Sequence, residues 1–62
     1  MCLAATGTIL TIEEVDPLWL RAQVDFGGVC QWVSLACLPE ARVGDRVLVH
    51  VGLALSLVDE EP

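Results

Sequence analysis

Cys2 combines a reactive side chain with an unusual position, directly behind the initiator methionine in the opening MCLAATG. Its small side chain is compatible with removal of Met1, which would leave the thiol next to a free terminal amine. An adjacent ammonium group favours the thiolate, and thiolates bind iron and other thiophilic metals. The plainer interpretation is an incidental small residue at a frayed chain end, and position alone favours it.

His50 is the only histidine and lies in the apolar stretch VLVHVG. If the valines of this strand, Val47, Val49 and Val51, face the core, the histidine lies on the outer or rim side. There it could bind a ligand or carry a proton near neutral pH. The plainer interpretation is a half-exposed histidine bonded to a backbone carbonyl. One histidine is too few for a zinc site built from protein side chains alone.

Cys30 and Cys37 complete an odd set of three cysteines with no CxxC pair and no zinc-finger spacing. Free cysteines are usually small buried hydrophobic residues, and we expect that role for both, while a Cys30–Cys37 bridge stays open. This cysteine usage is typical of a reduced, cytoplasmic compartment.

Trp19 and Trp32 fall on the faces opposite the inward residues of their own strands. One interpretation is an aromatic pair that stacks across the Gly27–Gly28 hairpin. The other is an exposed patch for a partner, since tryptophan is favoured at interface hot spots. The two interpretations are compatible.

The charge balance excludes several classes of partner. Nine acidic residues against three arginines give a net charge of −6, whereas nucleic acids and anionic membranes select clustered lysine and arginine. The apolar runs are too short to span a bilayer, and we expect no export signal. Because the sequence has no nucleophile–base pair, phosphate loop or paired catalytic carboxylates, we also expect no enzymatic activity.

The elements that position these residues are short strands. Alternating apolar and polar residues predict five of them, at residues 8–13, 18–26, 29–34, 46–51 and 54–58. In the second strand the predicted inward residues are Leu18, Leu20, Ala22, Val24 and Phe26. Its predicted outward residues are Trp19, Arg21, Gln23 and Asp25. In the third strand Val29 and Val33 are predicted to face inward.

Turn residues separate these strands. Gly27 and Gly28 supply the positive φ of a tight hairpin, residues 35–38 predict a short irregular or helical turn, Val43–Asp45 a second turn, and Gly52 a hinge. Five short strands without a convincing helix predict an all-β, SH3-like or OB-like barrel, because closure removes unpaired edges. We expect a single domain over 1–62, with a flexible segment over 1–7 carrying Cys2 and an acidic tail over 59–62.

Taken together, the opening MCLA with Gly7, the hairpin VDFGG, the segment VSLACLPEARVGDRVLVHVGLALS and the closing VDEE resemble the HypC/HupF/HybG family of NiFe-hydrogenase maturation chaperones. The resemblance covers nearly the whole chain. It implies a non-enzymatic, OB-like, five-stranded barrel in the cytoplasm. It also implies two partners, a HypD-like iron–sulfur protein and the precursor of the hydrogenase large subunit.

The resemblance also implies roles for individual residues. The family's essential N-terminal cysteine corresponds to Cys2 and its motif histidine to His50, so these two residues are the expected contacts to a transient Fe(CN)2CO group. The same correspondence assigns partner binding to Cys2, Leu3, Ala4, Gly7 and His50. No permanently bound cofactor is implied. A diverged module that binds a hydrogenase precursor without carrying iron is the alternative.

Two departures from the family pattern bear on these expectations. Where relatives usually have an aliphatic residue and then proline before the glycine, this chain has Ala5–Thr6, and we expect the missing proline to loosen the segment that presents Cys2. Many relatives also continue into a C-terminal helix, which we do not expect here. Self-association is one way in which a bare barrel face could be covered.

Overall fold

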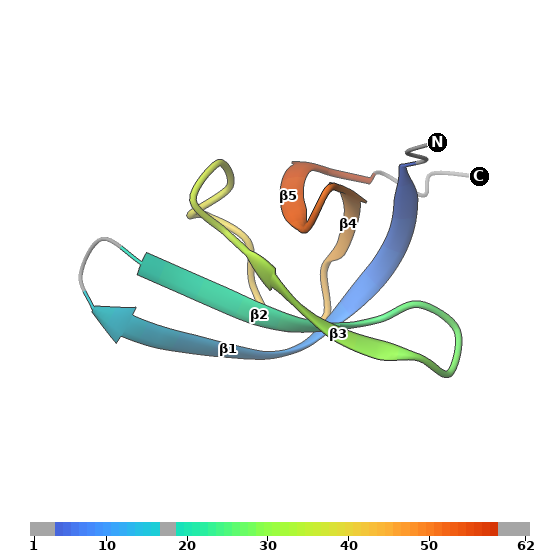
Figure 1. Ribbon diagram of the computed structural model, residues 1–62, viewed down its shortest axis with the longest axis horizontal. Helices are drawn as coiled ribbons and strands as arrows, with labels where there is room; N and C mark the ends of the chain where they lie inside the picture. The colour runs from blue at the N-terminus through green and yellow to red at the C-terminus, as the bar shows by residue number, and fades with distance from the viewer. Residues whose placement is uncertain (1–3, 17–18, 59–62) are drawn as a thin grey trace.

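The computed structural model describes residues 4–16 and 19–58, in which five strands form a closed barrel (Figure 1). They are β1 (Ala5–Asp16), β2 (Trp19–Asp25), β3 (Cys30–Ser34), β4 (Arg46–His50) and β5 (Leu53–Leu57). Around the barrel the order is β1-β2-β3-β5-β4, and β3 with β5 is the parallel pair. The described ranges contain no helix. This confirms the predicted all-β, OB-like barrel.

The core fills the barrel interior, and the inward residues of β2 and β4 supply much of it. Ala22, Val24 and Val47 are completely buried, as the strict alternation of their strands predicts. The other buried apolar residues are Ile9, Val33, Leu35, Leu38, Ala41, Val49 and Ala54. Leu20 and Phe26 are partly buried and pack against this core from either end of the β2 segment. Leu18 lies outside the described residues.

β1 is the longest strand, and it is bent by bulges. Its register against β2 shifts between Ile9 and Thr11, so Leu10 is the extra residue. This bulge puts both Ile9 and Ile12 on the inward face, opposite Val24 and Ala22. Leu10 itself is pushed out to solvent. Simple alternation would have placed the two isoleucines on opposite faces.

The start of β1 belongs to the barrel wall. Ala5, Thr6 and Gly7 pair with β4, so the strand begins three residues before the predicted Thr8, and residues 5–7 are a paired strand within the expected flexible segment 1–7. Gly7 is buried where β1 passes closest to β2. A Cβ at this position would meet the side chain of Val24 and lie 2.9 Å from the carbonyl oxygen of Asp25.

The predicted turns are confirmed. At the β2–β3 hairpin, Gly27 and Gly28 have φ of 87° and 109°, and the Asp25 carboxylate accepts hydrogen bonds from both of their amides. Residues 35–38 form an irregular turn, in which the Leu38 amide donates to the Leu35 carbonyl. Because Leu35 and Leu38 are buried and the Leu35 amide donates to the Leu20 carbonyl, this loop closes one end of the barrel.

Two predictions about side-chain direction are wrong, and one of the two interpretations of the tryptophans is ruled out. Val29 is 60 % exposed, because it belongs to the hairpin turn and β3 begins only at Cys30. Val51 is 71 % exposed, because β4 ends at His50 and Val51 enters a two-residue turn. Trp19 and Trp32 do not form a cross-strand pair, since the register places Trp32 opposite Gln23. Both indole rings are exposed, which agrees with the second interpretation.

We predict that Gly7→Ala lowers the free energy of unfolding by about 2 kcal/mol, because the added methyl group overpacks the wall between β1 and β2. The clash involves backbone at Asp25 as well as the ring of Phe26, so rotation of one side chain cannot relieve it. Urea denaturation followed by circular dichroism measures the change. An unchanged midpoint would show that the two strands separate easily at this point.

We predict that Val51→Asn raises the free energy of unfolding by about 1 kcal/mol. Val51 has φ of 57°, a region that β-branched residues avoid and asparagine tolerates, and Asn–Gly is a preferred pair for this turn. Val43→Asn is the matched control, because Val43 is 61 % exposed and lies outside the positive-φ region. Equal effects of the two substitutions on the urea midpoint would refute this account of the turn.

Candidate functional site

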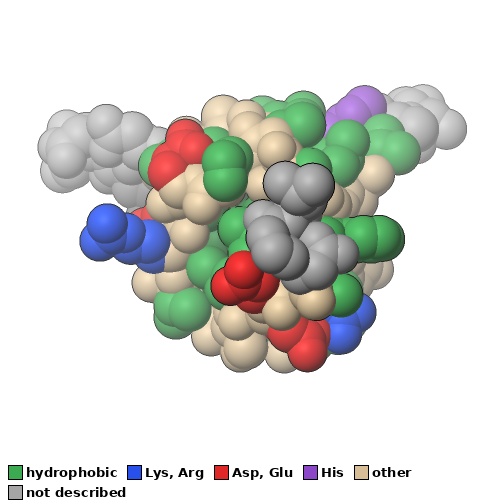
Figure 2. Space-filling view, turned by 90° about the vertical axis from the view of Figure 1, so that its left-hand side faces the viewer, with side chains coloured by type: hydrophobic (Ala, Val, Ile, Leu, Met, Phe, Trp, Pro, Cys, Tyr) green, Lys and Arg blue, Asp and Glu red, His purple; other side chains and the backbone are tan. Residues whose placement is uncertain are grey.

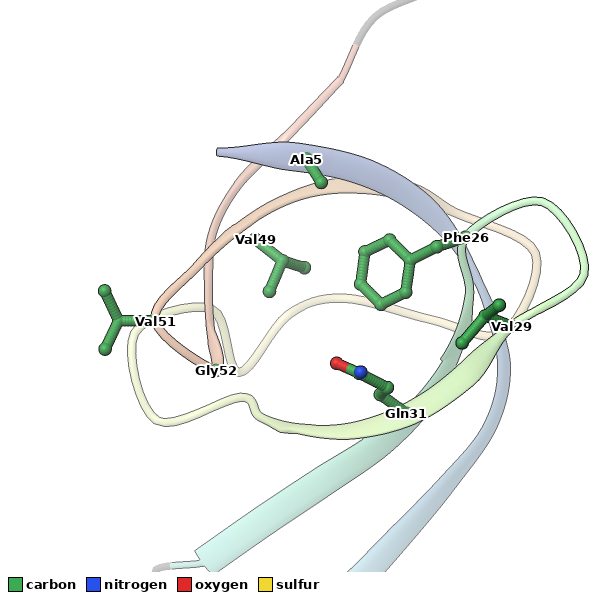
Figure 3. Close-up of a pocket in the computed structure, with 7 residues that line it drawn as sticks. All are labelled: Ala5, Phe26, Val29, Gln31, Val49, Val51 and Gly52. Carbon is green, nitrogen blue, oxygen red and sulfur yellow. The ribbon is translucent and has the colours of Figure 1, made fainter. Parts of the chain in front are cut away.

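The end of the barrel opposite the 35–41 loop is open and forms a pocket of about 260 Å³. Residues from three parts of the chain line it: Ala5, Phe26, Val29, Gln31, Val49, Val51 and Gly52. Figure 3 shows Phe26, Val49 and the Gln31 amide directed into the opening, whereas the Val51 side chain points away from it. We call this opening the barrel mouth.

The barrel mouth is apolar with one hydrogen-bonding side chain. Gln31 pairs with buried Val24 in the register, so its amide lies on the inward face, where it can donate to or accept from a ligand. None of the described lining residues is titratable. The mouth can therefore hold an aliphatic group and one polar group, but its described lining supplies no acid or base.

His50 lies at the rim of this end. It is the last residue of β4, it is half-buried, and it pairs with Leu53 of β5. Its neighbour Val49 faces the barrel mouth, so the imidazole takes the outer side of the strand, in agreement with the prediction. Within residues 4–16 and 19–58, no group of three or more histidine, cysteine or acidic side chains is arranged to hold a metal ion.

The N-terminal segment enters the barrel beside this histidine. Cys2 and Leu3 lie outside the described residues, and Ala4 is exposed. Ala5 pairs with Val49, and Thr6 pairs with Leu48. The Thr6 hydroxyl also accepts a hydrogen bond from Arg46 Nη2, at 3.0 Å. At Ala5–Thr6 the chain is thus held by β4, because both residues keep the amide that a strand ladder needs. The expected loosening of the segment that presents Cys2 concerns residues outside the described ranges and stays a prediction.

Gly7 has a clear structural role. It is buried, and the absence of a side chain lets Val24 and Phe26 pack against β1. Phe26 in turn forms one wall of the barrel mouth. Its assignment to partner binding stays a prediction.

The remaining cysteines are not core residues. Cys30 and Cys37 are both exposed and free, so the expected burial is wrong and the alternative of a bridge is not realised. Cys30 lies on the outer face of β3, opposite Asp25, and Cys37 lies in the 35–41 loop. No helix in the described ranges has the length and hydropathy needed to cross a membrane.

The barrel mouth is a feature that the sequence did not predict. The available signal was Gln31. It is polar, but it lies two residues before Val33 and therefore on the same, inward face of the strand. The sequence predicts Phe26 and Val29 as the last and first residues of adjacent strands, whereas both belong to the hairpin turn, where the Phe26 amide donates to the Val29 carbonyl at 2.8 Å.

The chain is similar in sequence to the members of a known protein family. The HupF/HypC family model matches residues 1–62. The chain is 52 % identical over 62 residues to the hydrogenase maturation factor HypC of Synechocystis sp., covering 98 % of this chain and 82 % of the relative. It is 38 % identical over 61 residues to HypC of Cupriavidus necator, covering 98 % and 63 %. It is 36 % identical over 66 residues to HybG of Escherichia coli, covering 98 % and 77 %. The chain belongs to the HupF/HypC family.

Proposed function

We propose that this protein is a hydrogenase maturation chaperone, which binds a HypD-like iron–sulfur protein and the precursor of the hydrogenase large subunit. In this proposal Cys2 helps to carry the Fe(CN)2CO group between the two partners, with His50 beside it. The barrel provides the scaffold and performs no catalysis itself. Family membership and the hydrogenase maturation factors among its relatives support the function.

The observation that carries the assignment of Cys2 is the pairing of Ala5 with Val49. Three residue steps separate Ala5 from Cys2, and each step spans at most about 3.6 Å. The covalent chain therefore keeps the Cys2 Cα within about 11 Å of the Ala5 Cα. Ala5 pairs with Val49, the residue next to His50, which supports the proposal that Cys2 and His50 act at the same end of the barrel.

A thiolate and an imidazole suit the proposed cargo. Both are good ligands for iron, and a single protein thiolate at a chain end can be presented to a second protein without opening the barrel. The apolar barrel mouth beside them offers a place for an aliphatic side chain of the partner. A cytoplasmic location is part of the proposal, and the free thiols of Cys30 and Cys37 agree with a reducing compartment.

The alternative function is a module that binds a hydrogenase precursor without carrying iron. The Ala5–Thr6 sequence motivates it, because Thr6 ties the start of β1 to Arg46 in place of the usual proline. Both functions need the same barrel, and they differ only in whether Cys2 holds the iron group.

We predict that Cys2→Ser abolishes co-purification with the HypD-like partner, because the hydroxyl does not replace a metal-binding thiolate. Cys37→Ser is the matched control: Cys37 is exposed and lies in the 35–41 loop, which closes the opposite end of the barrel, so this variant keeps the partner. Circular dichroism should show the same fold for both variants. Undiminished recovery of the partner by Cys2→Ser would count against the proposal.

Infrared spectroscopy of the partner-bound protein separates the two functions. For the iron carrier we expect cyanide and carbon monoxide stretching bands that are lost in Cys2→Ser and kept in Cys37→Ser. A complex that forms normally but shows no such bands in the wild-type protein establishes the alternative function instead.

A further inference from the structure

The outer face of β2 and β3 carries a group of exposed side chains that the proposed function does not use. Trp19 and Arg21 share the outer side of β2, and Trp32 lies on the outer side of β3, opposite Gln23 and next to Arg21. The indoles of Trp19 and Trp32 are 58 % and 45 % exposed. The Arg21 guanidinium carbon lies 4.4 Å from the centroid of the Trp32 ring. We call Trp19, Arg21 and Trp32 the aromatic face.

The arginine of this face is already engaged. Its Nε donates to Glu13 Oε1 at 2.6 Å, and its Nη2 lies 2.5 Å from the same oxygen. Glu13 and Arg21 are opposite each other in the β1–β2 register. Because this edge of the guanidinium is occupied and its charge is balanced by Glu13, Arg21 is poorly placed to bind an anion.

The charge around the aromatic face is negative. On the outer side of β1 and β2, the carboxylates are Glu13 and Asp25 and the cation is Arg21, so this side has an excess of one negative charge. Figure 2 views the end of the molecule where β1 leads to β2, and acidic and basic side chains both lie there among hydrophobic ones. The whole chain has the same sign, with a net charge of −6.

These features together select the class of ligand. OB-like barrels bind extended ligands on the face of β2 and β3, and single-stranded nucleic acids bind there by stacking on aromatic rings within a positively charged groove. Here the rings are present but the charge has the opposite sign. Exposed tryptophan with nearby carboxylates attracts cations instead, through the ring quadrupole and through ion pairs. The internal contact of Arg21 with Trp32 is an example of this chemistry.

We propose that the aromatic face is a docking surface for an extended, arginine- or lysine-containing segment of a partner protein, held by cation–π contacts with Trp19 and Trp32. A second copy of this chain is a poor occupant, because a two-fold interface would place the acidic groups of one face against those of the other. The surface is separate from the barrel mouth. Trp19 pairs with Asp16 at the far end of β1 from Ala5, and eleven strand residues of about 3.3 Å each separate the two ends.

The test measures binding of two fluorescently labelled peptides of equal length, one of alternating arginine and alanine and one of alternating glutamate and alanine, by fluorescence anisotropy. We expect the arginine peptide to bind, more weakly as salt rises, and the glutamate peptide not to bind. The double variant Trp19→Thr/Trp32→Thr, which keeps residues suited to strands, should weaken binding about tenfold. Leu57→Thr, at a similarly exposed position on β5, is the matched control and should bind as the wild type does.

Several outcomes would overturn the proposal. They are failure of the arginine peptide to bind, equal binding of the glutamate peptide, and equal binding by the double tryptophan variant. Self-association that sedimentation detects in the wild type and not in Trp32→Thr would assign the face to a second copy. Cys2→Ser should bind the arginine peptide normally, so loss of the HypD-like partner in that variant with retention of the peptide separates this surface from the proposed function.

Discussion

The passage of β1 along both β2 and β4 is the constraint on which the molecule depends. One strand closes the barrel by pairing with β4 over its first residues and with β2 over the remainder. Gly7 lies where β1 changes partners, and its missing side chain lets the strand approach Val24 and Phe26. A domain of 62 residues buries only about 60 % of its unfolded surface. The fold therefore depends on the close approach of β1 to Val24 and Phe26 to exclude water from its small core.

The same strand separates two surfaces. Its beginning is paired with Val49 and bonded from Arg46 to Thr6, so it is fixed at the end of the barrel that carries His50. Its other end carries Glu13, which pairs with Arg21 and so helps to set the aromatic face. An adaptor that must meet more than one protein is well served by surfaces at opposite ends of a rigid wall, because each can be occupied while the other stays free.

Regular alternation made much of this fold predictable, and irregularity accounts for the rest. The two-residue period of a strand predicts which face of β2 carries each side chain, and this is correct for Ala22, Val24, Trp19 and Arg21. The inward position of both Ile9 and Ile12 does not, because it requires a bulge at Leu10, and nothing in the local sequence marks that bulge. Val51 was misplaced because its turn tolerates a β-branched residue at positive φ. At the site, the resemblance implied roles for Cys2 and His50, which stay predictions. The barrel mouth depends on the meeting of three separate segments of the chain, which no single stretch encodes.

The contact between β3 and β5 has a consequence for how the barrel comes apart. These strands share one register pair, Ser34 with Leu53, and the Ser34 amide donates to Gly52 at 2.8 Å. Among residues 4–16 and 19–58, β3 and β5 share no further register pair, so the sheet is a three-stranded meander joined to the β4–β5 hairpin chiefly through β1. Thermal fluctuations should split this seam first, and its amides should exchange with deuterium ahead of those in the β1–β2 ladder. When β3 and β5 separate, the hydrophobic edge of β5 becomes a template for pairing with strands of other molecules. We therefore expect aggregation at high temperature or high protein concentration to begin at this edge.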